Sequence, residues 1–301
     1  MQADLPEIDL ISASRRGPIV AILSGVHGDE YEGVLAARRL AVLLRHELVA
    51  GSVRISAPAH PAAWRATTRE SSRDGLNLAR VFPGSADGTP TERVAFELTH
   101  RQIRGADLVI DLHSAGSNYE MPFLCGYQRT DDAWTAESER FASVFGADFS
   151  WKHIGPPAPG RSLSVAYELR IPAVYTEASG GRSIRYRELR GFIDGCLRVL
   201  HELDMVESAP TRTAPIRRVT GDGNTDQGLV CPVAGYLVSD VACGQKVRGG
   251  DVIAEILGDS GESLTSIRSP GDRVVMMRRR DAHVEVGDSV FILASEDVAP
   301  E

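Results

Sequence analysis

Two apolar runs of this chain end in a histidine, and a third carries a glutamate near its end. Ile19–Val26 precedes His27, the segment DLVIDLHS carries His113 as its penultimate residue, and PAVYTEA contains Glu177. Short, continuously apolar runs are typical of strands that are buried on both faces of a sheet. The carboxyl ends of parallel strands meet at one edge of a sheet, where α/β proteins bind ligands. We therefore expect these three side chains at one site.

The segments between these runs have helical character. Glu30–Leu48 follows the first run and places Val34, Leu35, Leu40, Leu43 and Leu44 near helical spacing. Further helices are predicted at residues 91–103, 133–145 and 188–203, and a further strand at 52–58. Strands that alternate with helices predict an α/β fold, here a mostly parallel sheet covered by helices.

The pattern changes after about residue 205. A polar, proline-containing linker at 206–215 precedes short apolar segments that are separated by glycine-rich turns from Ile216 to Ala294. This predicts a catalytic domain at 1–205 and an all-β domain at 216–301. The pattern of the second domain resembles the barrel-sandwich folds of biotinyl and lipoyl carriers. Its turn RSPGDR lacks the lysine that a carrier would modify, so we expect a domain that caps the site or supports assembly.

Composition narrows the partners. The 301 residues carry 33 basic and 41 acidic side chains, a net charge of -8, which argues against nucleic acid and anionic membranes as partners. No apolar run approaches the ~20 residues of a membrane span. We find no basic, apolar leader at the N-terminus, and the four cysteines form no C-x-x-C pair. We expect a cytoplasmic protein with a small-molecule partner, and leave a homo-oligomer open.

His27, Glu30 and His113 form the candidate metal site. Two histidines and a carboxylate are a ligand set of catalytic Zn²⁺, with another position left for water, so we predict one Zn²⁺ per chain. The glycines Gly25 and Gly28 flank His27 and let the backbone turn sharply toward the site. The alternative for each histidine alone is a hydrogen-bonded loop residue.

Two carboxylates have candidate roles beside the metal. Asp111, two residues before His113, could share its face of the strand and orient its imidazole. Glu177 is the candidate general base, which would take a proton from water and pass it to the leaving nitrogen. The alternative for Glu177 is a structural ion pair with an arginine.

The loop TTRESSRDGLNLARVFPG supplies three arginines, Arg69, Arg73 and Arg80. Guanidinium groups bind carboxylates in bidentate fashion and stabilise oxyanions. We select Arg69 and Arg80 as candidate site residues, although arginines on loops are usually solvated.

The motifs GVHGDEYEG, TTRESSRDGLNLARVFPG, DLHS and TEASGG, in this order, resemble those of the succinylglutamate desuccinylase and aspartoacylase family, relatives of zinc carboxypeptidases. The resemblance covers about residues 19–181 and includes a C-terminal β-domain. It implies a zinc carboxypeptidase-like fold, with His27, Glu30 and His113 as zinc ligands and Glu177 as general base and acid. It also implies that Arg69 polarises the scissile carbonyl and that Arg80 holds a substrate carboxylate.

One position departs from the family. Its common N-L-N-R reads N-L-A-R here, with Ala79 before the arginine, so either Asn77 binds the substrate in its place or the substrate differs. The general layout is closer to the bacterial branch that includes N-acetyl-diaminobutyrate deacetylase. We expect zinc-dependent hydrolysis of the amide bond of a small N-acyl amino acid or related compound.

Two other functions stay open. One is a carboxypeptidase that acts on peptides, and the other is a non-catalytic binding or assembly protein that retains zinc. The chain has no G-x-S-x-G nucleophile motif and no G-x-x-x-x-G-K-[ST] phosphate loop, which disfavours a serine hydrolase and a nucleotide-binding protein.

Overall fold

Four adjacent parallel strands form one half of the main sheet. The computed structural model describes residues 4–212, 214–222 and 228–297. In the middle of the sheet β4 lies between β2 and β8, and β3 and β1 continue it beyond β2, with β1 antiparallel. The bounds are Asp9–Ser12 (β1), Arg15–Ser24 (β2), Ala50–Ser56 (β3), Leu108–Ser114 (β4) and Ala173–Ala178 (β8).

Beyond β8 the sheet reverses direction. Strand β6 (Leu124–Arg129) is antiparallel to β8, and β7 (Phe149–Ile154) and β9 (Arg217–Thr220) run parallel to β6. The expected α/β fold with a large helix-covered sheet is confirmed. The sheet is mixed, however, because only the half from β3 to β8 keeps the parallel order that the alternating pattern predicts.

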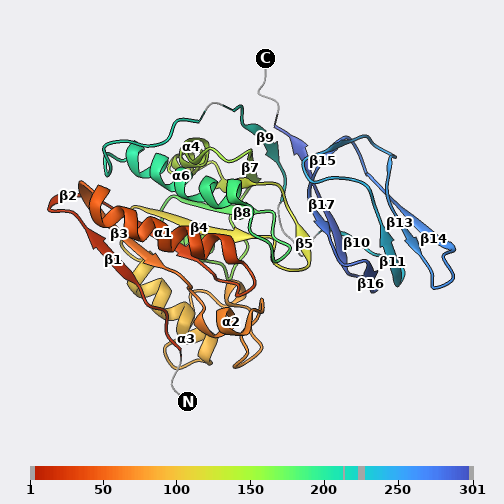
Figure 1. Ribbon diagram of the computed structural model, residues 1–301, viewed down its shortest axis with the longest axis horizontal. Helices are drawn as coiled ribbons and strands as arrows, with labels where there is room; N and C mark the ends of the chain where they lie inside the picture. Colours follow the sequence, from red (N-terminus) through yellow and green to blue (C-terminus); the bar gives the residue numbers. More distant parts are fainter. Residues whose placement is uncertain (1–3, 213, 223–227, 298–301) are drawn as a thin grey trace.

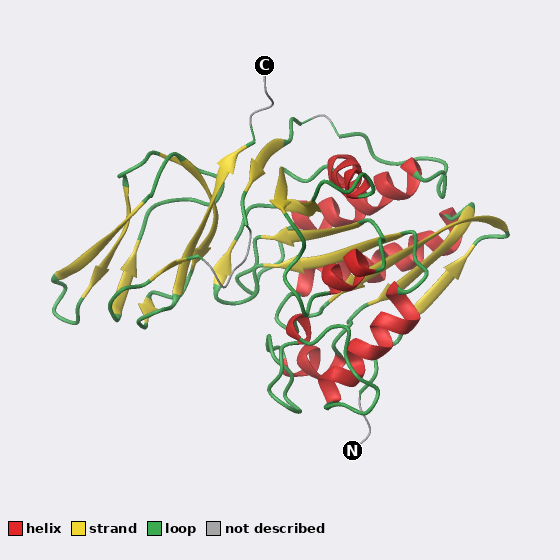
Figure 2. Cartoon of the chain, turned by 180° about the vertical axis from the view of Figure 1, so that it is seen from behind, coloured by secondary structure: helices red, strands yellow, loops and turns green. Residues whose placement is uncertain are grey.

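Helices cover both faces of this sheet (Figures 1 and 2). Successive residues of β2 point to opposite faces, so Ile22 packs in one apolar cluster and Leu23 in the other. The Ile22 cluster includes residues of α1 (Tyr31–Glu47), α4 (Thr135–Phe145) and α6 (Tyr186–Glu202). The Leu23 cluster includes residues of α3 (Pro90–Glu97), the π-helical turn η2 (Leu98–Ile103) and α5 (Ser162–Glu168). Because both faces of these strands are buried, their sequences are continuously apolar.

The predicted helices lie close to the observed ones, with one difference. The helix expected at residues 91–103 is α3 followed by η2. Thr89 and Glu92 form a capping box that starts α3, with Pro90 as its first residue. The 3-10 turn η1 (Leu78–Arg80) lies in the arginine-bearing segment that we treated as a loop, and the short helix α2 (Pro61–Ala66) directly precedes that segment.

The C-terminal strands form two layers, and one of these layers continues the main sheet (Figure 1). Strands β17, β15 and β12 extend the main sheet beyond β9, while a second, antiparallel sheet has the order β14-β13-β11-β16. Apolar residues of both layers pack together, including Ile256 and Phe291. The remaining bounds are Tyr119–Glu120 (β5), Leu229–Val230 (β10), Gly235–Val238 (β11), Lys246–Val247 (β12), Val252–Leu257 (β13), Ser263–Arg268 (β14), Arg273–Arg279 (β15), His283–Val284 (β16) and Ser289–Glu296 (β17).

The two halves of the chain share strands as well as side chains. Strand β5, which follows the loop after β4, pairs with β15 of the C-terminal part. The Trp151 side chain is fully buried in a cluster that includes Val219 and Met276. Within the described residues, no helix combines the length and apolar character that crossing a bilayer requires.

Candidate active site

The sheet brings the predicted histidines and glutamates to one edge. His27 and Glu30 lie in the loop between β2 and α1, and His113 and Glu177 are paired across the neighbouring strands β4 and β8. The loop after β2 turns at Gly25, whose φ is +68°. At Gly28 a Cβ atom would lie 1.9 Å from a backbone carbonyl oxygen, so this close approach requires glycine.

The three predicted metal ligands face one point. His27 Nδ1 lies 2.7 Å from Glu30 Oε1, and His113 Nδ1 lies 2.9 Å from Glu30 Oε2. One donor atom from each residue lies within 4.8 Å of those of the other two. Among the described residues this is the one group of three or more His, Cys, Asp or Glu side chains with such a geometry. The arrangement suits a cation held by two imidazoles and a carboxylate.

The outer nitrogen of each imidazole also has a partner. His113 Nε2 lies 3.1 Å from Asp111 Oδ1, and Ser162 Oγ donates to the other oxygen of Asp111. His27 Nε2 lies 3.1 Å from Asn77 Oδ1. Asp111 therefore lies beside His113, and its orienting role stays a prediction. No sequence pattern indicates the contact between His27 and Asn77.

The three candidate ligands differ in the direction of their pKa shifts. Burial would raise the pKa of Glu30, but the facing imidazoles of His27 and His113 outweigh it and lower that pKa. Burial would likewise lower the pKa of His113, yet the carboxylates of Asp111 and Glu30 raise it well above its usual value. Burial and the nearby Arg69 lower the pKa of His27. The carboxylate Glu30 is thus kept ionised between two nitrogen donors.

Glu177 differs from Glu30 in its surroundings. Its Oε2 atom is buried and has no hydrogen-bond partner among the described residues. Burial raises its pKa to about 8, against an opposing effect of His113. A carboxyl group with a raised pKa and a buried oxygen that lacks a hydrogen-bond partner, beside a cluster of donors, is expected of a general acid or base.

Arg69 contacts the cluster of His27 and Glu30. Arg69 Nη1 lies 3.3 Å from His27 Nδ1 and 3.5 Å from Glu30 Oε1. Arg80 ends the turn η1, and its Nη1 donates to the carbonyl of Ala79 at 3.0 Å. Arg73 is an exposed side chain whose Nη2 lies 3.3 Å from a carboxylate oxygen of Asp4.

A hydrogen-bonded pair of side chains near Glu177 was not predicted from the sequence. Tyr175 is two residues before Glu177 on the same face of β8, and its hydroxyl lies 2.8 Å from His153 Nε2 on β7. Gly126, opposite Tyr175 on β6, leaves the space in which the ring lies, since a Cβ atom there would be 2.1 Å from Tyr175 Cε1. The period of two along β8 could have indicated Tyr175, but nothing in the sequence pairs it with His153.

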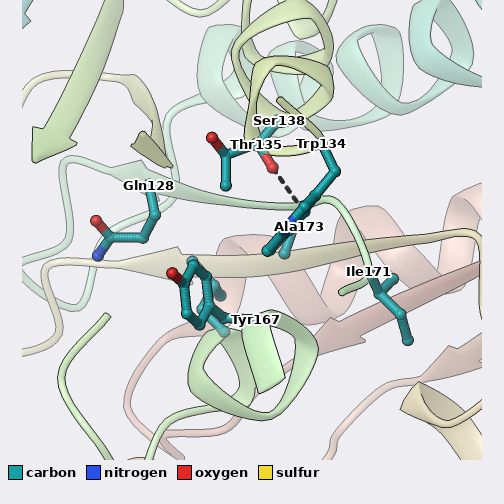
Figure 3. Close-up of a pocket in the computed structure, with 8 residues that line it drawn as sticks. Gln128, Trp134, Thr135, Ser138, Tyr167, Ile171 and Ala173 are labelled. Carbon is teal, nitrogen blue, oxygen red and sulfur yellow. Dashed lines mark hydrogen bonds between the residues drawn. The ribbon is translucent and has the colours of Figure 1, made fainter. Parts of the chain in front are cut away.

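A separate small pocket lies between α4, α5 and the sheet. Its lining contains none of the predicted site residues, and the Ser138 hydroxyl there accepts a hydrogen bond from the backbone of Ala173 (Figure 3). The residues that line it are Gln128, Trp134, Thr135, Ser138, Leu163, Tyr167, Ile171 and Ala173.

Comparison with known proteins decides the family. The model of the succinylglutamate desuccinylase/aspartoacylase catalytic domain matches residues 16–203, more than half of the chain. The chain belongs to this family. The resemblance inferred from the motifs is therefore confirmed, and membership in a family of deacylases supports hydrolase activity.

Individual relatives agree with this family. The chain is 29% identical over 294 residues to N-alpha-acetyl-L-2,4-diaminobutyric acid deacetylase from Halomonas elongata, covering 92% of this chain and 82% of the relative. It superposes with a TM-score of 0.87 on a succinylglutamate desuccinylase/aspartoacylase from Rhodobacter sphaeroides, at 26% identity, covering 97% of this chain and 89% of that one. The ectoine utilization protein EutE from Ruegeria pomeroyi, at 23% identity, has the same fold, with a TM-score of 0.85 and coverage of 98% and 97%.

Proposed function

We propose that this chain is a zinc-dependent deacylase that hydrolyses the amide bond of a small N-acyl amino acid or related compound. The observation that carries the proposal is the convergence of His27, Glu30 and His113 beside Glu177, whose Oε2 atom has no hydrogen-bond partner among the described residues. The family supports deacylation in general. The metal, the roles of the residues and the substrate are the parts that we propose.

The donor set fits zinc. His27 and His113 would each offer Nδ1 and Glu30 a carboxylate oxygen, which leaves room for a water or a substrate oxygen. When bound, the ion would act as a Lewis acid on the scissile carbonyl and would lower the pKa of a water to about 7.

Glu177 and Arg69 would carry the chemistry that belongs to the chain itself. Glu177 would take the proton of the attacking water and pass it to the leaving nitrogen, as a general base and then a general acid. A raised pKa, about 8 in the metal-free protein, suits a carboxyl group that must hold and then release this proton. Arg69, whose guanidinium lies 3.5 Å from Glu30, would donate to the oxyanion of the tetrahedral intermediate.

Substrate binding is assigned to the arginine-bearing segment. Arg80 would bind the substrate carboxylate, with the amide nitrogen of Asn77 as a second donor in place of the asparagine that Ala79 replaces. The all-β part would narrow access to the cleft and favour small substrates over polypeptides. The name of the Halomonas relative makes N-acetylated diamino acids the first compounds to test, followed by N-succinyl amino acids.

The location and assembly of the protein are further parts of the proposal. The four cysteines are unpaired, and three of them are buried. Free thiols suit a reducing compartment, so we propose a cytoplasmic location. Light scattering of the purified protein tests for a homo-oligomer.

Metal analysis coupled to an amine-release screen tests the function. We expect about one zinc per chain in the wild type, loss of both zinc and hydrolysis in His113→Ala, and no loss in His283→Ala, a variant of an exposed histidine. Glu177→Gln should keep the metal and lower turnover roughly 10²- to 10⁴-fold. A wild type that neither binds zinc nor gains activity with it would refute the proposal.

The same screen separates the two other functions. Faster hydrolysis of short peptides than of N-acyl amino acids would identify a carboxypeptidase. A Glu177→Gln variant that binds zinc and keeps the biological role of the protein would identify a non-catalytic binding protein.

A further inference from the structure

The side chain of Asn77 is fixed by two hydrogen bonds to one atom. Asn77 precedes the turn η1, and its Oδ1 accepts from the backbone N–H of Ala79 at 2.8 Å. The same atom lies 3.1 Å from His27 Nε2. A backbone N–H can only donate, so the Asn77 atom that faces Ala79 must be the amide oxygen. The orientation of the amide is thereby set by the main chain.

This orientation determines what Asn77 offers to His27. Because the atom that faces His27 Nε2 is an oxygen, it can only accept, and Nε2 must be the nitrogen that carries the proton in that contact. A neutral imidazole has one N–H, so the other nitrogen, Nδ1, then keeps its lone pair. Nδ1 is the atom that faces Glu30, at 2.7 Å. The Asn77 contact therefore favours the tautomer in which His27 can coordinate a cation through Nδ1.

Glu30 competes for the same proton in the metal-free protein. Its carboxylate lies at Nδ1, and a proton placed there would leave Nε2 without a hydrogen to give to Asn77. A cation at Nδ1 removes this competition. The ring proton then lies on Nε2, and Asn77 Oδ1 accepts it in a hydrogen bond. His113 has the same arrangement, with Nδ1 toward Glu30 and Nε2 toward Asp111. An oxygen atom thus lies beside the Nε2 atom of each imidazole.

We infer that Asn77 is a positioning residue that holds His27 in the metal-binding tautomer and ring orientation. The inference rests on the proposed metal site, and it gives Asn77 a task distinct from binding the substrate. The Oδ1 atom already accepts two hydrogen bonds, which use both of its lone pairs. Only the amide nitrogen is left for a substrate. Partners of this kind typically change metal affinity 10- to 100-fold.

Three substitutions at one position separate the effect on His27 from an effect on the turn. Asn77→Ala removes both hydrogen bonds. Asn77→Ser keeps a short hydroxyl that can accept from Ala79 N–H, as serine does at helix N-termini, but the hydroxyl is too short to reach the imidazole as well. Asn77→Asp keeps an oxygen acceptor for both donors. The conservative variant that should rescue the contact with His27 is therefore aspartate, and the control for the turn is serine.

The measurement is the zinc dissociation constant of each variant, from competition with a chromophoric chelator. We expect roughly 10- to 100-fold weaker binding in both Asn77→Ala and Asn77→Ser, and affinity within a few-fold of wild type, or tighter, in Asn77→Asp. Nitrogen-15 NMR of the zinc-loaded wild type should show the His27 proton on Nε2. Thermal unfolding of the metal-free variants identifies any that fail to fold, and Asn77→Ser then remains the test.

The result that overturns the inference is distinct from failure of the proposed function. If Asn77→Ser binds zinc as tightly as wild type, Asn77 does not position His27, although the metal site stands. A His27 proton on Nδ1 in the zinc-loaded protein would overturn it equally. A wild type that binds no zinc would instead remove the proposed function itself.

Discussion

His153 allows a quantitative test of the buried hydrogen bonds beside the candidate site. The ring is 4% exposed, with Nδ1 at 2.8 Å from the carbonyl oxygen of Gly221 and Nε2 at 2.8 Å from the hydroxyl of Tyr175. A carbonyl only accepts, so Nδ1 carries the proton and Tyr175 donates to Nε2. Both nitrogens of the neutral ring are therefore satisfied. Burial lowers the pKa of His153 to about 4.

The direction of the pH effect follows from this shift. The pKa of His153 falls from 6.5 in the unfolded chain to about 4 in the folded protein, so between these values the unfolded chain binds a proton that the folded protein does not. The stability that the neutral ring contributes is complete above pH 6.5 and is lost as the pH falls toward 4. One pKa unit corresponds to about 1.4 kcal/mol, which gives a loss of roughly 2 kcal/mol near pH 5 and about 3 kcal/mol at the limit.

Urea unfolding of the metal-free protein at about pH 7.5 and about pH 5 measures this loss. His153→Gln keeps an N–H donor and an oxygen acceptor but does not titrate. We expect the free energy of unfolding of the wild type to fall by roughly 2 kcal/mol more than that of the variant. His60 is also buried and also has a pKa of about 4, but it is present in both proteins and cancels in the comparison. His283→Gln, at an exposed position, should behave as wild type. Equal losses in wild type and His153→Gln would refute the reasoning.

Three further substitutions test packing around the site. Gly28→Ala would bring Cβ to 1.9 Å from a backbone oxygen. We expect the free energy of unfolding in urea to fall by about 1–3 kcal/mol and zinc binding to weaken. Unchanged values of both would contradict the close approach. Gly126→Ala would push Cβ against the Tyr175 ring, with a similar loss of stability that Tyr175→Ala in the same chain should partly relieve. Glu120→Gln weakens two contacts with Arg278, at 3.0 and 2.9 Å. It should lower the free energy of unfolding by about 1–3 kcal/mol in the same assay. No change would show that this pair does not stabilise the junction of the two halves.

The candidate metal site could be predicted because its residues follow from strand order. His27, His113 and Glu177 each end or follow a strand that is buried on both faces, and such strands lie parallel and adjacent, so their carboxyl ends coincide. The contact of Asn77 with His27 and that of His153 with Tyr175 could not be predicted in this way. Each depends on side-chain rotamers and loop paths between segments that no periodic pattern connects.

The main sheet continues across the change of composition near residue 215. Strand β9, at Arg217–Thr220, pairs with β7 on one side and with β17 on the other, so hydrogen bonds of the main sheet continue into the C-terminal part. Val219 and Met276 belong to the cluster that buries Trp151. A truncation before β9 would therefore expose a fully buried tryptophan and an unpaired strand edge. Loss of activity in such a truncation would not distinguish a cap from a structural support. The capping role is better tested by point variants on the exposed side of the loops, with the sheet intact.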